Sequence, residues 1–455
     1  MEKILDGVNR FVWGIPALIL ILGVGVYLSF LTNFAQIRLL PKALGRLRQM
    51  LLGRTQKDSF QALCTALAAT VGTGNIAGVA GAIALGGPGS IFWMWICAFL
   101  GMVTKYAEAV LAVLYREKTE SGELLAGPMY MIRQGMPRRF HWLGSAYCLF
   151  GCLAAFGVGN ATQINAVLDS AASAADSLGW QLTQLQNLLL AGVLGLLAMW
   201  SLLGGAKRIG KFTSVLVPFA SGAYILLCML AIIGRFDRVG QAFWQILEGA
   251  FCPKAVTGGL LGSSFVALRV GVSRGVFTNE AGMGTAAIAH GTAQPQDPWD
   301  QGLMGILEVF LDTVVICTLT ALVILTSGIS VPYGLDEGAA LTVRAFSAVL
   351  GPWVSLVISV FLGLFAFATV LGWGFYGIRC THYLLGERAV KPFVFLMLLG
   401  SLAGVFLGTG PVWSLSETVN GLMAIPSLLA LAVLGPKVAK NKSARRRSCK
   451  WLNKK

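Results

Sequence analysis

Long apolar stretches separated by short polar segments run through most of the chain. A helix crosses the roughly 30 Å hydrocarbon core of a bilayer with about 20 residues, and eleven stretches are of about this length or longer. The predicted membrane spans are approximately residues 11–32, 60–85, 88–115, 142–168, 187–204, 209–234, 256–277, 302–328, 352–380, 391–409 and 411–435. This pattern predicts an all-α polytopic membrane protein.

Two further segments, 238–251 and 338–350, mix polar and apolar positions at helical spacing. We expect both to form helices that lie over the spans at the outer face of the membrane. An irregular loop is the alternative for each.

Lys and Arg are distributed unevenly between the two sides that these spans define. Alternate loops and the C-terminal segment together hold 27 of them, the opposite side holds 6, and Lys105 and Arg269 fall within spans. Because positive residues accumulate in cytoplasmic loops, the N-terminus is predicted outside and the basic tail at 436–455 in the cytoplasm. Nine positive residues lie in the last nineteen. That clustering indicates topology, with weak attraction to anionic lipid, rather than nucleic-acid binding.

The composition excludes a water-soluble enzyme. Hydrophobic residues make up 56% of the chain and charged residues 12%, whereas soluble domains carry about 25% charged residues. The nine cysteines include no Cys-x-x-Cys pair, so neither zinc nor haem is indicated. The three histidines, His141, His290 and His382, fall at predicted cytoplasmic ends, which argues against a membrane-embedded enzyme. No organic cofactor, nucleic-acid partner or obligatory protein partner is predicted.

The span at 60–85 is interrupted in its middle. Polar residues and glycines alternate over residues 70–75, inside an apolar run that is longer than the membrane requires. A broken helix is tolerated at this depth where its freed amides and carbonyls line a cavity or meet a ligand. Freed amides at the start of the second half-helix suit an anion, and freed carbonyls suit a small cation. Close helix packing through Gly74, Gly78 and Ala82 is the alternative.

A second glycine-rich segment lies five spans later. The glycines that interrupt the span at 256–277 are Gly258, Gly259, Gly262, Gly271 and Gly275. Paired interruptions at corresponding places in two halves indicate an inverted-repeat transporter with its site near the bilayer midplane. Residues 60–234 and 256–435 then form a five-plus-five repeat within one transmembrane domain at 1–435, and span 11–32 is an extra N-terminal helix.

Several stretches carry a specific family resemblance. They are VGTGNIAGVAGAIALGGPGSIFWMWICAFLGMVTKYAEAVLAVLYR (71–116), GPMYMIRQGM (127–136), FGVGNATQINAV (156–167), RGVFTNEAGMGTAAIAH (274–290) and ILEVFLDTVVICTLTALVILTSG (306–328). In this order, the chain resembles the sodium:alanine (alanine/glycine:cation) symporter family of the amino acid–polyamine–organocation superfamily. The resemblance implies a leucine-transporter-type inverted repeat with two discontinuous helices, in the inner membrane of a prokaryote.

The resemblance also implies sodium-coupled uptake of a small neutral amino acid, alanine or glycine. The substrate ammonium would meet carbonyls of the interrupted seventh span near Val270 and Gly271. The residues whose amides would hold the substrate carboxylate are Gly72, Thr73, Gly74 and Asn75.

Span four carries three amide side chains, Asn160, Gln163 and Asn165. Asn160 and Gln163 are three residues apart and are expected to share a helical face. We assign at least one of the three amides to the substrate pocket, and an interhelical hydrogen bond is the alternative for each. Trp373, with Phe156, is the candidate for closing the pocket over a small side chain, and filling of core volume is the alternative.

On the same resemblance, sodium would be held by uncharged oxygen atoms, a ligand set that suits this ion. The predicted ligands, on the first half-helix of span two and on span nine, are Ala69, Thr70, Ala366 and Thr369. Ala368 stands where a hydroxyl residue is often found in the family. The number of sodium ions therefore stays open.

Charged residues within spans are candidates for function by default. Lys105 and Glu108 are three residues apart and are expected to pair on one helical face. Glu308 and Asp312 are four residues apart, where like charges repel. At least one of these two is therefore expected to be protonated or to have a cationic partner. We interpret this set as structural and gating ion pairs.

Arg269 and Arg274 are the cationic partners predicted for that acidic pair. Asn279 and Glu280 are placed in the cytoplasmic loop that follows span seven, where they would contribute to a gate.

Alternatives to sodium-coupled alanine or glycine transport remain open from the sequence. The same fold could couple to protons or carry another neutral amino acid such as glutamine. An ion channel would need a continuous polar pore, and the sequence shows two local interruptions. The chain has no G-x-x-x-x-G-K-[ST] motif for ATP binding.

Overall fold

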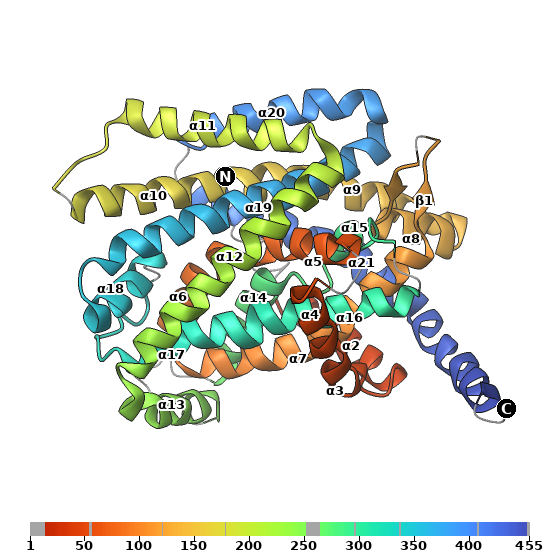
Figure 1. Ribbon diagram of the computed structural model, residues 1–455, viewed down its shortest axis with the longest axis horizontal. Helices are drawn as coiled ribbons and strands as arrows, with labels where there is room; N and C mark the ends of the chain where they lie inside the picture. The colour runs from red at the N-terminus through yellow and green to blue at the C-terminus, as the bar shows by residue number, and fades with distance from the viewer. Residues whose placement is uncertain are drawn as a thin grey trace.

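The computed structural model describes residues 14–53, 57–120, 122–177, 179–251, 264–294, 297–335, 338–406 and 409–452. Almost all of these residues are helical, and one short hairpin pairs β1 (Glu117–Lys118) with β2 (Leu124–Leu125) in antiparallel register (Figure 1). The predicted helical class is confirmed.

Seven helices in the described part of the chain are long and apolar enough to cross a membrane. They are α7 (Gly89–Leu114), α9 (Trp142–Phe156) continued by η3 (Gly157–Ala161) and α10 (Thr162–Ser177), α11 (Gln184–Leu202), α12 (Gly205–Ile233), α16 (Pro298–Val309) continued by η5 (Phe310–Cys317) and α17 (Thr318–Thr326), α19 (Val354–Leu385) and the first part of α21 (Thr409–Leu452). Each coincides with a predicted span.

A further crossing is bent in its middle. The helix α5 (Lys57–Thr70) stops, and η1 (Gly74–Gly78) with α6 (Val79–Gly86) continues at 52° to it. The bend falls within the interrupted part of the predicted span at 60–85.

The remaining predicted spans contain shorter helices, each close to residues outside the described part of the chain. These helices are α2 (Ile15–Leu31), α14 (Ser264–Asn279) and α20 (Val390–Ala403). The total of eleven spans therefore stays a prediction.

The interruption expected near Val270 and Gly271 is not found, because α14 runs unbroken through both residues. Gly258, Gly259 and Gly262 lie outside the described residues. The chain breaks later, at residues 280–284, before α15 (Thr285–His290).

The glycines of α14 serve close packing rather than a break. A Cβ atom on Gly271 would collide with the Ser90 carbonyl oxygen and lie 2.7 Å from Cβ of Trp93, and one on Gly275 would lie 3.1 Å from Cβ of Cys97. Glycine therefore lets α14 approach α7 closely, as small residues do between membrane helices.

Shorter elements complete the described fold. They are α3 (Ala35–Arg38), α4 (Leu40–Leu51), α8 (Pro128–Gly135), η2 (Arg138–Phe140), η4 (Phe236–Arg238), α13 (Val239–Phe251), α18 (Ala339–Leu350) and η6 (Glu387–Ala389). The helices predicted at 238–251 and 338–350 are confirmed as α13 and α18, and their position at the outer face stays a prediction.

The helix α7 packs against both α14 and α16, and the three lie together in the lower part of Figure 1. Gly302 and Gly305 allow the close approach of α16, since a Cβ on either would lie 2.7 Å from atoms of Tyr106 or Lys105. The helices α10, α11, α19 and α20 occupy the upper part of the view, and α5 contacts both α16 and α19. The bend after α5 thus lies between these two groups.

Candidate functional site

The side chain of Asn75 stabilises the bend after α5. We call this bend the first break (residues 71–73). The Gly72 backbone amide donates to the side-chain oxygen Oδ1 of Asn75 at 2.8 Å, and the backbone amide of Asn75 donates to the Gly72 carbonyl at 3.3 Å. The amides of Thr73 and Gly74 begin the second half-helix, where helix geometry provides no intrahelical acceptor. The first break therefore directs amide donors into the bundle.

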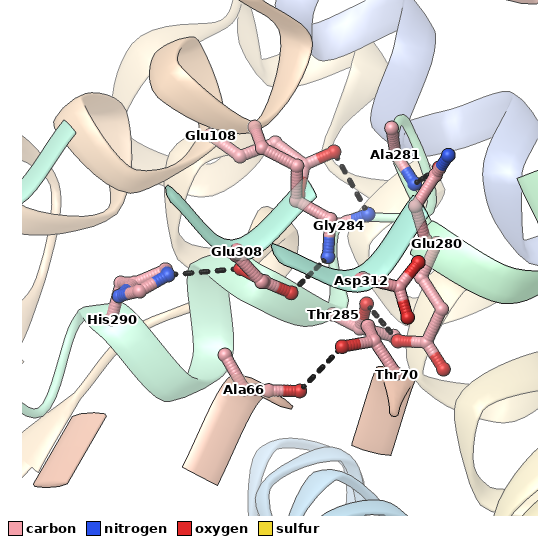
Figure 2. A network of polar contacts seen from close by, with 12 residues as sticks. Ala66, Thr70, Glu108, Glu280, Ala281, Gly284, Thr285, His290, Glu308 and Asp312 are labelled. Carbon is pink, nitrogen blue, oxygen red and sulfur yellow. Dashed lines mark hydrogen bonds and ion pairs between the residues drawn. The ribbon is translucent and has the colours of Figure 1, made fainter. Parts of the chain in front are cut away.

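The second break (residues 280–284) is held by a carboxylate from another helix. Glu108 of α7 accepts hydrogen bonds at Oε1 from the amides of Gly282 at 2.8 Å and Gly284 at 3.3 Å. Figure 2 shows Glu108 above this segment. Gly282 and Gly284 have φ of 90° and 79°, which a residue with a side chain adopts only with strain.

Glu280 is also strained and buried. It has a φ of 53° and is 3% exposed. Thr285 Oγ1 donates to Glu280 Oε2 at 2.6 Å (Figure 2), and the Ala281 amide donates to Asn279 Oδ1 at 3.0 Å. Asn279 ends α14 and Glu280 follows it, and both are buried; their contribution to a cytoplasmic gate stays a prediction.

A chain of hydrogen bonds connects the two breaks through η5. Asn75 Nδ2 donates to Asp312 Oδ1 at 2.7 Å, and Thr313 Oγ1 donates to Asp312 Oδ2 at 2.7 Å. Asn279 Nδ2 in turn donates to Thr313 Oγ1 at 3.2 Å. All four residues are fully buried. We call this chain the Asp312 bridge; it ties the first break to the residue that precedes the second.

A cavity of about 20 Å³, enough for a water molecule, lies where the two breaks meet. Its lining comes from both breaks and from α5, α10, α14 and α19: Ala69, Thr70, Gly72, Thr73, Gly74, Gln163, Phe277, Glu280, Thr369 and Trp373. The structure therefore brings together most residues that the sequence assigned to substrate and sodium, and adds Phe277 and Glu280.

The cavity has a polar side and an aromatic side. Thr73 Oγ1 contacts Gln163 Oε1 at 3.3 Å, so the amide of α10 reaches the first break. The Trp373 indole lies beside the Glu280 carboxylate. Gly159 leaves room for Trp373, because a Cβ at position 159 would collide with it.

The candidate sodium ligands gather where α5 meets α19. A Cβ on Gly72 would lie 2.6 Å from Oγ1 of Thr369, and one on Gly372 would lie 2.7 Å from Cβ of Ala69. The oxygen atoms at the end of α5 therefore lie close to the Thr369 hydroxyl. Ala366 is buried one turn earlier on α19 and does not line the cavity.

Phe156 and Asn160 face α20 instead of the cavity. The Phe156 ring lies 5.0 Å from that of Phe393, and Asn160 bonds to the Met397 carbonyl and the Ser401 hydroxyl of α20 at 2.6 and 2.7 Å. The expected shared face of Asn160 and Gln163 is not found. The physical reason is the π-helical segment η3, which inserts a wider turn and rotates the following residues.

The other residues predicted for the substrate site also lie off the cavity. Asn75 is occupied within the first break, and Asn165 is buried on α10. Val270 and Gly271 are part of α14, whose helical hydrogen bonds use their carbonyls. None of the four lines the cavity.

Lys105 pairs with Glu308, not with Glu108. Its Nζ lies 2.6 Å from Glu308 Oε1, and His290 Nε2 lies 3.0 Å from Glu308 Oε2 (Figure 2). Gln301 Nε2 lies 2.8 Å from His290 Nδ1. The expectation of a Lys105–Glu108 pair is wrong, because α16 packs so close to α7 that it supplies a better-placed carboxylate.

Two further expectations on charge are corrected. The cationic partner of the acidic pair on span eight is Lys105, whereas Arg269 is exposed on α14. His290 is fully buried, not at a span end. The buried ionic cluster is thus built from α7, α15 and α16.

A separate set of ion pairs lies at the β1–β2 hairpin. Glu123 Oε1 contacts Arg379 at 2.6 Å, and Glu117 contacts Arg133. Burial alone would raise the pKa of Glu123, but the hydrogen bond and charge of Arg379 outweigh it, so its pKa lies below the usual value. The hairpin is therefore fastened to the ends of α8 and α19.

The sequence profile of the sodium:alanine symporter family matches residues 1–450. The chain belongs to this family. It is 42% identical over 445 residues to the sodium/alanine symporter AgcS of Methanococcus maripaludis, covering 95% of this chain and 94% of that protein. It is 35% identical over 442 residues to the probable sodium/glutamine symporter GlnT of Bacillus subtilis, covering 95% and 88%. The chain is therefore a multi-pass membrane protein of a transporter family, which confirms the resemblance seen in its motifs.

The fold is shared with a solved transporter structure. The crystal structure of MhsT in complex with L-phenylalanine matches with a TM-score of 0.57 at 15% identity, covering 84% of this chain and 88% of that chain. At this identity the match shows the fold alone. It agrees with the leucine-transporter type of architecture that the resemblance implies.

Proposed function

We propose that the protein imports a small neutral amino acid, alanine or glycine, together with sodium by alternating access. The observation that carries the proposal is the cavity at the meeting of the two breaks. It offers amide donors from one break and a carboxylate from the other. A small zwitterion needs this pair of opposite features.

The substrate carboxylate is placed against the first break in this proposal. The amides of Thr73 and Gly74, with the positive end of the half-helix dipole, attract an anion, and Gln163 adds a polar contact. The substrate ammonium is directed toward Glu280. Trp373 and Phe277 then cover the side chain and limit its size.

Sodium occupies the oxygen atoms between α5 and α19 in this proposal. The ligands are the carbonyls of Ala69 and Thr70 with the hydroxyl of Thr369, and the carbonyl of Ala366 lies one turn away. One sodium ion moving through about 100 mV and a tenfold gradient releases about 3.7 kcal/mol. One ion is therefore sufficient for strong accumulation of a zwitterion.

The wider architecture belongs to the same proposal. Residues 1–435 form one transmembrane domain with eleven spans, the extra helix at 11–32 and inverted repeats at 60–234 and 256–435. The similar position of the two breaks, after α5 and after α14, supports the repeat. The protein resides in the inner membrane of a prokaryote, with its N-terminus outside and the tail at 436–455 in the cytoplasm.

Glutamine is the second candidate substrate. The similarity to the GlnT relative favours it, whereas the small cavity between Phe277 and Trp373 favours alanine or glycine. Coupling to protons in place of sodium is the corresponding alternative for the ion.

Uptake into proteoliposomes tests the proposal. Purified protein is reconstituted, a sodium gradient is imposed, and accumulation of labelled alanine, glycine and glutamine is compared with the same vesicles in potassium. We expect sodium-dependent accumulation of alanine or glycine. Absence of sodium-dependent accumulation for all three amino acids would reject the proposal.

A further inference from the structure

Glu108 differs from the other buried carboxylates of the cluster in how its oxygen atoms are used. Glu308 has both oxygens paired, to Lys105 and His290. Asp312 likewise accepts a hydrogen bond at each oxygen, and Glu280 accepts one from Thr285 and lines the cavity. Glu108 accepts two amides at Oε1, but its buried Oε2 has no hydrogen-bond partner.

No cation among the described residues is left over for Glu108. Lys105, one turn earlier on the same helix, directs its ammonium to Glu308 at 2.6 Å and attracts Glu108 without forming an ion pair with it. Glu308 opposes that attraction with a negative charge nearby. An ionised Oε2 at a fully buried position would therefore be an unpaired charge in a region of low dielectric, which proteins avoid.

The surroundings of Glu108 offer acceptors for a proton instead. The hydroxyls of Tyr147 on α9 and Tyr376 on α19 are buried, close enough to Glu108 to interact electrostatically, and without a hydrogen-bond partner. Ser427 of α21 adds another unpartnered hydroxyl beside Gly284. No hydrogen bond joins these hydroxyls to Oε2 in this structure. A phenol oxygen accepts a bond from a carboxylic acid hydroxyl when the two groups approach each other.

We propose that Glu108 is a proton-binding residue, with an exchangeable proton on Oε2 in the conformation described here. Binding forms an O–H bond from a solvent proton and makes the side chain neutral; release breaks that bond and leaves the carboxylate. The neutral form keeps Oε1 as the acceptor for Gly282 and Gly284 and so preserves the second break. Release places a negative charge next to the amides of that break.

The groups that face this site come from every element around it. They are Lys105 on α7, Glu308 on α16, Tyr147 on α9 and Tyr376 on α19. Glu280 in the second break and His290 on α15 are drawn with Glu108 in Figure 2. The role of the proton in transport rests on the proposed function. In that role, the proton makes transport sensitive to pH through the second break, while sodium acts at α5 and α19.

Infrared spectroscopy of the purified protein tests proton binding without any transport. Wild-type protein is expected to show the carbonyl band of a protonated carboxylic acid at neutral pH, and the band is expected to disappear on alkaline titration. Glu108→Gln should remove this band. Glu308→Gln, which alters a carboxylate paired with Lys105, and Glu387→Gln on the exposed turn η6 are the controls that should retain it.

A band that is absent in the wild type, or unchanged in a folded Glu108→Gln variant, would overturn the proposal. If Glu108→Gln does not fold, Tyr376→Phe serves instead: loss of the neighbouring hydroxyl should shift the frequency of the band, and an unshifted band would count against Glu108.

The pH profile of sodium-driven alanine uptake gives the second readout. One linked proton changes the wild-type rate by up to about tenfold per pH unit on the alkaline side, and Glu108→Gln should flatten this dependence. A wild-type band without any uptake would reject the proposed function and leave the proton site in place. Uptake whose pH profile is unchanged in Glu108→Gln would reject the proton site and leave the proposed function in place.

Discussion

Each break leaves backbone amides without helical acceptors, and the two breaks satisfy these amides with different side chains. The first break satisfies its own amide through Asn75, three residues later in the same segment. The second break depends on Glu108 from α7 and includes a buried glutamate in a left-handed conformation. A left-handed residue other than glycine is strained by roughly 1–3 kcal/mol and persists only where its surroundings require it. The first break is thus locally determined, and the second depends on tertiary contacts.

The difference also separates the charges that each break offers to the cavity. The first presents amides and a threonine hydroxyl, and the second presents the Glu280 carboxylate. The Asp312 bridge keeps these two ends in a fixed relation. A change at one break should therefore affect the geometry of the other.

Removing the bridge should have the largest effect. Asp312→Ala leaves the Thr313 hydroxyl without its buried carboxylate acceptor. Asn75 loses its shortest bond and keeps only those to the backbone carbonyl of residue 312 at 3.1 Å and to the Cys317 sulfur at 3.3 Å. Each unsatisfied buried group costs about 1–3 kcal/mol, so we expect sodium-driven uptake to fall roughly 10- to 100-fold. Uptake per inserted molecule in proteoliposomes measures this. Asp237→Ala, on an exposed side chain, is the control, and equal activity in both variants would show that the breaks act independently.

A methyl group on the first break should disturb sodium more than substrate. In Gly72→Ala the new Cβ would lie 2.6 Å from the Thr369 hydroxyl. Overpacking of this kind costs about 1–3 kcal/mol, which predicts a roughly 10- to 100-fold higher sodium requirement. The sodium dependence of alanine uptake is the measurement.

Two other glycines of the same segment provide matched controls. A Cβ on Gly78 meets nothing within 4 Å, and one on Gly74 makes only ordinary contacts at 3.6 Å with Phe277 and Thr278. Gly78→Ala should leave the sodium requirement near that of wild type, and Gly74→Ala should change it little. An equal increase in all three variants would mean that helix flexibility, not the Thr369 contact, is responsible.

Removing the negative charge of Glu280 in the second break should change chiefly the affinity for substrate. Glu280→Gln keeps the shape of the side chain but removes the carboxylate that we propose to meet the substrate ammonium. Hydrogen bonds to charged groups contribute about 1.5–3 kcal/mol, so the KM for alanine should rise by roughly tenfold or more. A variant with unchanged KM but lower maximal rate would place Glu280 outside the substrate contact.

The smallest effect is expected far from both breaks, at the β1–β2 hairpin. Arg379 lowers the pKa of Glu123 below its ordinary value of 4.5, so the pair stabilises the folded state above that pH and loses its effect as Glu123 becomes protonated at lower pH. Because Glu123 is 45% exposed, Glu123→Gln should cost less than about 1 kcal/mol. Thermal unfolding in detergent at pH 7 and at pH 4 measures the difference, which should be largest at pH 7 and smaller at pH 4.

The same contrast explains what the sequence could and could not predict. The first break was predictable because polar residues and glycines interrupt an otherwise apolar run. The second is predicted at Gly258, Gly259, Gly262, Gly271 and Gly275. The first three lie outside the described residues, and the last two allow α14 to pack on α7. Its actual signal is Asn279 and Glu280 followed by Gly282 and Gly284, the same combination of polar residues and glycines.

Side-chain partners were harder to predict than backbone breaks. Nothing in the spacing of residues 156–163 shows that η3 is π-helical, so Asn160 was expected on the face of Gln163. The partner of Lys105 depends on the distance between α7 and α16, which local spacing does not encode. By contrast, the family resemblance points to Gln163, Thr369 and Trp373 as site residues, and all three line the cavity.

Equilibrium binding of alanine to the purified protein tests the central claim most directly, namely that sodium and substrate occupy one site formed by the two breaks. Titration is carried out in sodium and in potassium, for wild type and for Thr369→Val, which removes a candidate sodium oxygen. We expect alanine to bind the wild type in sodium and at least about tenfold more weakly in potassium, with Thr369→Val showing the weaker binding in both salts. Wild-type affinity that is equal in the two salts, or affinity in sodium that is unaffected by Thr369→Val, would contradict the account.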